Sequence, residues 1–171
     1  MSDQEEFMAL NSPVDLFLYE LSGALDAEKK GIEWKGELIG QIRDSNVQQV
    51  LRTEQQEGQQ KIKNLETCFQ ALGKRQQDVP CLAIDGMRAE SQQFMSQNPS
   101  PQVLDMYVAG ASSKLAHFGS ATYKGLVGKA TMMGDTRCAQ ALQANLVMKE
   151  DSATRWERVG HEVSQRVMAT A

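Results

Sequence analysis

A single stretch, residues 101–133, carries the strongest helical pattern in this chain of 171 residues. Its apolar side chains recur at steps of three and four, the spacing that places them on one face of an α-helix. Residues 110–121, at its midpoint, are rich in glycine, alanine and serine. Small side chains let a neighbouring helix approach closely, so we interpret this region as a packing surface. The residues on the predicted face are Leu104, Val108, Ala111, Leu115, Phe118, Thr122 and Leu126.

Three other stretches show the same periodicity, over residues 13–43, 46–72 and 136–168. Tight turns join the first stretch to the second and the third to the fourth, so each pair should be antiparallel. The connection between the pairs is long and contains a shorter predicted helix, residues 81–97. We therefore predict an all-α fold, a ferritin-like four-helix bundle with an additional short helix in the crossover.

The length of the chain is suited to one domain with a sizeable core. We expect residues 1–11 to form a flexible leader and residues 12–168 to form a single bundle domain. Ser12 and Pro13 mark the boundary, because serine caps helix N-termini and proline fits the first helical position.

The composition excludes several classes of protein. The formal net charge is −4 and no basic block is present, so we expect no nucleic-acid partner. No apolar run reaches membrane-spanning length, and the acidic, polar start is unlike a secretory signal. The three cysteines are an odd number and lie far apart in the sequence, which favours free thiols. These features predict a cytoplasmic protein that does not enter a membrane.

Charged residues interrupt the apolar faces of three predicted helices. Glu28 lies at the centre of the first face, and Lys149 at the centre of the last. Glu54 and Glu57 lie three residues apart, hence on one side of the second helix. That side is either a solvated surface or part of an internal polar site.

Several segments, in order and spacing, are similar to one known family. The chain resembles the YciE/YciF family of ferritin-like, stress-associated bundle proteins, a domain of unknown function, over residues 13–160. The resemblance implies an all-helical bundle with a di-metal carboxylate centre in its interior. The matching segments are residues 16–21, 26–29, 58–65, 81–86, 103–105 and 114–118, with Ala121 and Tyr123.

The chain departs from this family at the implied metal centre. Where the third long helix of the family reads Glu-His-Tyr-Glu, this chain has Ala116, His117, Phe118 and Gly119, so both carboxylates are absent. His117 also lies about 200° around the helix from Leu115, off the apolar face. The resemblance leaves five candidate metal ligands of a vestigial site: Glu28, Glu54, Glu57, His117 and Glu150.

We therefore expect a non-catalytic bundle with a degenerate di-metal site and a structural, binding or stress-associated role. It would have no cofactor and would form a homodimer. One alternative is an iron or manganese protein with altered ligands, active in oxidative stress or metal handling. Another is a module that binds a protein partner within a larger assembly.

Lys149 suggests how the negative charge of the vestigial site is neutralised. Its ammonium could replace the missing metal and form an internal ion pair with Glu28. Alternatively, Lys149 extends to the surface and Glu28 holds water. We also expect neighbouring side chains, rather than a void, to occupy the space at Ala116 and Gly119. The bulky candidates are Trp34, Met148 and Trp156.

Overall fold

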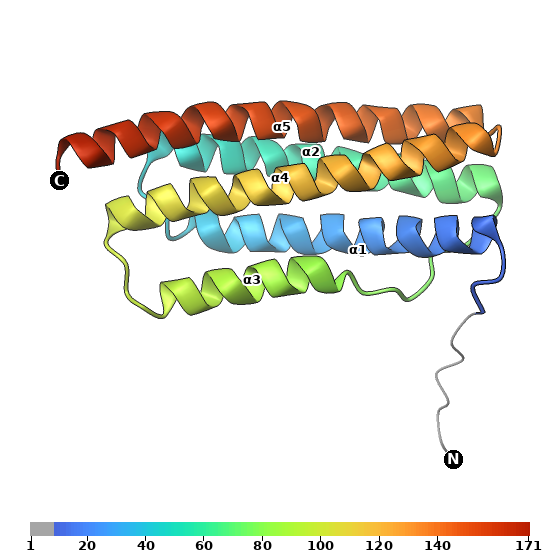
Figure 1. Ribbon diagram of the computed structural model, residues 1–171, viewed down its shortest axis with the longest axis horizontal. Helices are drawn as coiled ribbons and strands as arrows, with labels where there is room; N and C mark the ends of the chain where they lie inside the picture. Colours follow the sequence, from blue (N-terminus) through green and yellow to red (C-terminus); the bar gives the residue numbers. More distant parts are fainter. Residues whose placement is uncertain (1–8) are drawn as a thin grey trace, which may run out of the picture.

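The computed structural model describes residues 9–171, so most of the predicted leader, residues 1–11, lies outside the described residues. The four long helices run side by side, and the short α3 flanks them (Figure 1). This arrangement confirms the predicted all-α, ferritin-like bundle with an extra helix in the crossover. The helices are α1 (Pro13–Ile39), α2 (Ser45–Leu72), α3 (Leu82–Met95), α4 (Pro101–Met132) and α5 (Thr136–Ala169).

The ends of α1 are set by local hydrogen bonds. The Ser12 hydroxyl accepts a hydrogen bond from the backbone N–H of Asp15, and the Asp15 carboxylate accepts one from the backbone N–H of Ser12. This reciprocal capping box satisfies two free N–H groups of the first turn. The helix ends at Ile39, four residues earlier than predicted, because the chain turns at Gly40 toward α2. Ile42 lies in this turn, yet its side chain is buried in the core.

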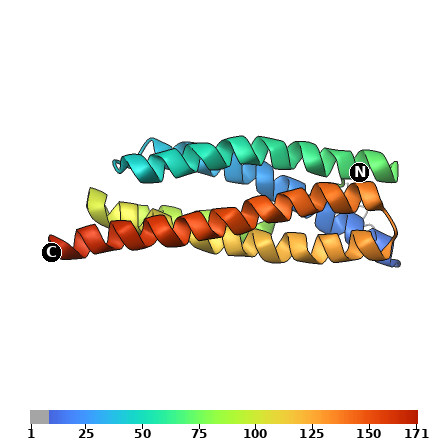
Figure 2. The same ribbon diagram turned by 90° about the horizontal axis from the view of Figure 1, so that it is seen from above.

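The helices associate as two antiparallel pairs, α1 with α2 and α4 with α5. Figure 2 shows the two pairs as layers, with α2 running along α5. In contrast, α1 and α4 contact each other less extensively than either helix contacts its antiparallel partner. The long connection places α3 against both α1 and α4. None of the helices in residues 9–171 is both long and apolar enough to cross a membrane.

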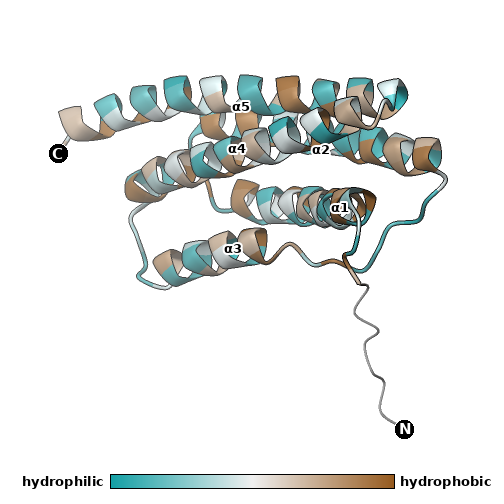
Figure 3. Ribbon diagram, turned by 45° about the vertical axis from the view of Figure 1, so that its right-hand side comes forward, coloured by the Kyte–Doolittle hydropathy of each residue, from teal (hydrophilic) through white to brown (hydrophobic). Residues whose placement is uncertain are grey.

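The apolar core is divided into two clusters along the bundle axis. One cluster fills the end that contains Trp34, Leu51 and Val108. The other fills the end that contains Phe17 and Leu142. Hydrophilic turns interleave with hydrophobic ones along the helices (Figure 3). The layer between the two clusters is polar and contains buried charged side chains.

Candidate functional site, a buried cluster of lysines and carboxylates

Five charged side chains lie inside the bundle between the two apolar clusters, and we call them the charged cluster. None is more than 7% exposed. Three of the four long helices contribute, because each carries charge at the middle of its inward face. The members are Glu28 and Lys35 of α1, Glu54 and Lys61 of α2, and Lys149 of α5.

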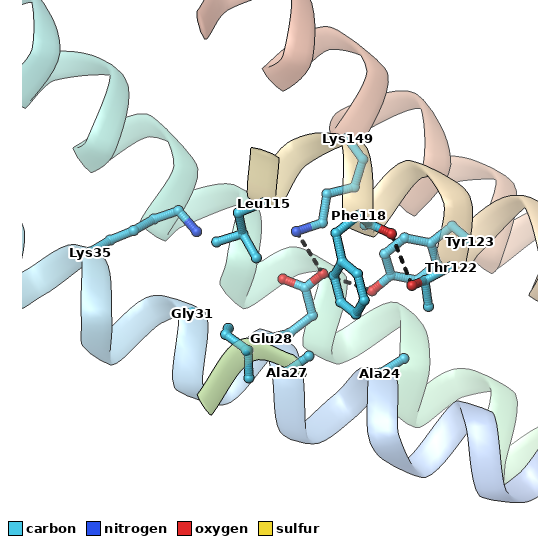
Figure 4. Close-up of a pocket in the computed structure, with 12 residues that line it drawn as sticks. Ala24, Ala27, Glu28, Gly31, Lys35, Leu115, Phe118, Thr122, Tyr123 and Lys149 are labelled. Carbon is cyan, nitrogen blue, oxygen red and sulfur yellow. Dashed lines mark hydrogen bonds and ion pairs between the residues drawn. The ribbon is translucent and has the colours of Figure 1, made fainter. Parts of the chain in front are cut away.

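Glu28 lies at the centre of the charged cluster. One carboxylate oxygen, Oε1, lies 3.2 Å from Lys149 Nζ, and Oε2 lies 3.5 Å from Lys61 Nζ. The buried Tyr123 hydroxyl also donates a 2.9 Å hydrogen bond to Oε1 (Figure 4). Burial by itself would raise the pKa of Glu28, but Lys149, Lys61 and Lys35 together lower the pKa to about 2. Glu28 is therefore ionised at neutral pH.

Glu54 has a separate set of partners. The Trp156 indole N–H donates a 2.7 Å hydrogen bond to Glu54 Oε1, and the Ser152 hydroxyl donates to the same oxygen. The other oxygen, Oε2, lies 4.0 Å from Lys35 Nζ. Both buried carboxylates are thus bound by protein donors, as buried charges must be.

The three lysines respond differently to burial. For Lys149, burial would lower the pKa, but Glu28 and Glu54 raise it above its ordinary value. For Lys61, burial dominates and lowers the pKa to about 8, although Glu28 opposes this shift. Burial also lowers the pKa of Lys35. With every group ionised, three ammonium groups face two carboxylates, which leaves one excess positive charge in the cluster.

Lys149 also fills space next to α4. A Cβ atom at Gly119 would lie 2.6 Å from both Lys149 Cδ and Lys149 Cε, which is closer than real side chains approach. The predicted filling of this space by a side chain is therefore confirmed at Gly119. The side chain is Lys149, however, and not one of the bulky residues that the sequence suggested, Trp34, Met148 or Trp156.

The structure brings together only two of the five candidate metal ligands, Glu28 and Glu54. Glu57 lies at the margin of the cluster, where Arg155 binds both of its carboxylate oxygens. His117 and Glu150 lie on the surface. There His117 Nε2 is 3.2 Å from Glu157 Oε1, and Glu150 Oε1 is 3.4 Å from Lys124 Nζ.

The donor set does not fit a dinuclear carboxylate centre. Across residues 9–171, no three side chains of histidine, cysteine, aspartate or glutamate converge in a way that could hold a metal ion. Such a centre in a helical bundle draws carboxylates and histidines from all four facing helices. Here α4 presents Gly119 and Tyr123 to the cluster, and ammonium groups contact both carboxylates.

Sequence reasoning missed four members of the site: Lys35, Lys61, Tyr123 and Ser152. A signal existed for the two lysines, since each follows a buried glutamate by seven residues. Glu28 precedes Lys35 and Glu54 precedes Lys61 at this interval, which returns to the same face of a helix. No comparable pattern marks Tyr123, because the predicted apolar face of its helix passes through Thr122, one residue away.

Comparison with known proteins places the chain in a family. Residues 12–168 match the family described as Domain of unknown function (DUF892). The chain belongs to this family. The match confirms the resemblance drawn from the sequence, and solved structures of similar fold support it. No curated protein sequence matches the chain.

Two solved structures have the same fold. One is YcfI of Rhodopseudomonas palustris, described as a proposed structural protein. It is 24% identical, with a TM-score of 0.83, over 92% of this chain and 98% of that one. The other is the E. coli stress protein YciF, 18% identical with a TM-score of 0.87, over 91% of this chain and 99% of that one. At these identities the likeness establishes the fold alone.

Proposed function

We propose that this DUF892 protein is a non-catalytic helical bundle with a structural or binding role, held together without metal. One observation carries the proposal. The Lys149 ammonium lies 3.2 Å from Glu28, and the stem of Lys149 fills the space that a side chain at position 119 would need. A lysine thus supplies positive charge at the point where the resemblance implies a cation.

A transition metal would gain few ligands at this position. Glu28 would have to exchange Lys149, Lys61 and the Tyr123 hydroxyl for the metal. The displaced ammonium groups would then remain buried without a counter-ion, which is costly. This exchange disfavours the alternative of an iron or manganese centre with altered ligands.

The similar proteins support a stress-associated or structural setting. E. coli YciF is called a stress protein, and YcfI is described as a proposed structural protein. We extend that setting to this chain as part of the proposal. The homodimer, the protein partner and the cytoplasmic location stay predictions, and native mass measurement of the purified protein addresses the first two.

Elemental analysis of protein purified without chelators tests the proposal. We expect iron and manganese well below one ion per chain, and a melting temperature that is the same in chelator and in added Fe(II) or Mn(II). About two transition-metal ions per chain, as in dinuclear centres, would overturn it. Glu28→Ala is the matched variant, because it should abolish any loading that involves the charged cluster.

A further inference from the structure

The crevice between α1 and α4 contains a small cavity beside the charged cluster. Its volume is about 20 Å³, room for roughly one water-sized group. Three charged residues line it, Glu28, Lys35 and Lys149, together with apolar side chains of α1 and α4. Figure 4 shows Lys35 reaching toward this cavity from one side and Lys149 from another.

A larger apolar groove adjoins this cavity. It has a volume of about 360 Å³ and runs between α1, α4 and the segment that leads into α3. Tyr19 and Leu82 lie on it and are 45% and 74% exposed. The groove and the cavity share four lining residues, so they lie side by side, and we call the two together the path: Ala24, Ala27, Phe118 and Thr122.

This path is long, and the groove that forms its outer part is mainly apolar. Between Tyr19 at the groove and Lys35 at the cavity, α1 rises by about 24 Å at 1.5 Å per residue. The groove end is lined mainly by aliphatic and aromatic side chains, with the Glu20–Lys129 ion pair at 2.8 Å on it, and the cavity end by two ammonium groups and the Glu28 carboxylate. Its dimensions match an extended hydrocarbon chain with a small charged head.

The net positive charge beside the cavity favours an anionic ligand. The charged cluster has one more ammonium group than carboxylates when all are ionised. Glu28 is already held by Lys149, Lys61 and Tyr123. In contrast, the closest carboxylate to Lys35 within residues 9–171 is Glu54, at 4.0 Å, and Lys35 Nζ makes no hydrogen bond there. Lys35 is therefore the cation that is open to another partner.

We propose that this crevice binds a long-chain monocarboxylate of the fatty-acid class, with the carboxylate at Lys35 and the hydrocarbon chain along the groove. One added negative charge neutralises the cluster. A peptide would fit poorly, because its backbone N–H and C=O groups would lie unpaired against apolar walls. The site goes beyond the proposed function and does not depend on whether the bundle contains metal.

Calorimetry with octanoate, dodecanoate and dodecanol tests this proposal on the purified chain. Dodecanoate should bind roughly tenfold or more tightly than octanoate, because each buried methylene contributes to affinity. Dodecanol, which has the same chain and no charge, should bind at least about tenfold more weakly than dodecanoate, because a hydrogen bond to a charged group is lost. Equal binding of the acid and the alcohol would overturn the proposal.

Two variants locate the site. Lys35→Met removes the head-group cation, and Gly125→Phe blocks the groove from α4 without touching the charged cluster. Each should weaken dodecanoate binding roughly tenfold or more. Gly128→Phe is the matched control, because Gly128 lies in open space three residues farther along α4 and does not line the groove.

The outcomes separate this proposal from the function proposed above. Unchanged binding in both Lys35→Met and Gly125→Phe, with folding verified by circular dichroism, would overturn the fatty-acid site. The absence of any dodecanoate binding would also overturn it. Neither result bears on the metal content, and a metal-loaded protein would contradict the proposed function whether or not dodecanoate binds.

Discussion

The two ends of the bundle and its middle exclude water by different means. At the ends, hydrocarbon side chains are fully buried, such as Leu51 in one apolar cluster and Leu21 in the other. In the middle, charged side chains are buried to almost the same degree, and both carboxylates lie close to ammonium groups. The ends gain stability from apolar burial, at roughly 25 cal/mol per Å². The middle gains much less, because desolvation of charge offsets most of the attraction between the ions.

This difference shows what each region contributes. The apolar ends would pack in many related sequences, since cores tolerate volume-conserving exchanges. The charged cluster tolerates few changes, because loss of one partner strands another buried charge. A buried polar layer can also fix which faces of the helices meet, and we apply this idea to the present bundle as a hypothesis.

The largest effect is expected from Lys149→Met. It leaves the Glu28 carboxylate without its closest ammonium, so the free energy of unfolding should fall by about 3–5 kcal/mol. Urea denaturation measures this change. Lys124→Met on the surface is the matched control and should have an effect of less than about 1 kcal/mol. A similar small loss in both variants would mean that the middle of the bundle is no more sensitive than its surface.

The dependence of the free energy of unfolding on pH should come mainly from the charged cluster in the middle of the bundle. Lys61 has a pKa of about 8 when folded and 10.5 as its ordinary value, so the unfolded chain binds more protons between these values. Stability should therefore rise between pH 8 and 10.5, by up to about 3 kcal/mol at 1.36 kcal/mol per pKa unit. Glu28 acts at the acid side: its stabilisation is complete above pH 4.5 and is lost as the pH falls toward 2.

Urea denaturation across this range measures both effects. Lys61→Met should reduce the alkaline rise, and a smaller rise should remain because burial also lowers the pKa of Lys35. It should also reduce the acid loss, because Lys61 is one of the lysines that lower the pKa of Glu28. If stability rises by the same amount in Lys61→Met as in the unchanged protein, the rise comes from another group and the role given to Lys61 is wrong.

A smaller effect is expected where Lys149 meets α4. Gly119→Ala places a methyl group against the Lys149 stem and should destabilise the bundle by about 1–3 kcal/mol. Gly110→Ala is the control, because Gly110 lies in open space on the same helix. It should stabilise the helix by roughly 0.5–1 kcal/mol. Thermal unfolding compares the two, and equal shifts would show that Lys149 can move aside.

Local patterns made the fold predictable from the sequence. Apolar periodicity, the cap at Ser12 and the long crossover indicated four long helices and a short one, and the structure confirms them. The end of α1 was misplaced because Ile42 continues the apolar pattern after the helix has ended. Its side chain contributes to the core from a turn, which periodicity cannot distinguish from a helix.

The site was only partly predictable, because it depends on contacts between helices. Charge at the centre of an apolar face identified Glu28 and Lys149, and the structure places them 3.2 Å apart. Adjacent residues point about 100° apart on a helix, which is why Glu150 lies on the surface beside the buried Lys149. The partners of Lys61 and Tyr123 belong to other helices, and no spacing within one helix could assign them.

The central claim is that an internal lysine balances Glu28 in place of a metal, and a double-mutant cycle on Glu28 and Lys149 tests it most directly. The cycle combines Glu28→Gln, Lys149→Met and the double variant, each measured by urea denaturation in chelator. The account predicts a coupling energy of at least about 1.5 kcal/mol, with the double variant recovering much of the loss caused by Lys149→Met. Mild, additive effects of the two single changes would contradict it.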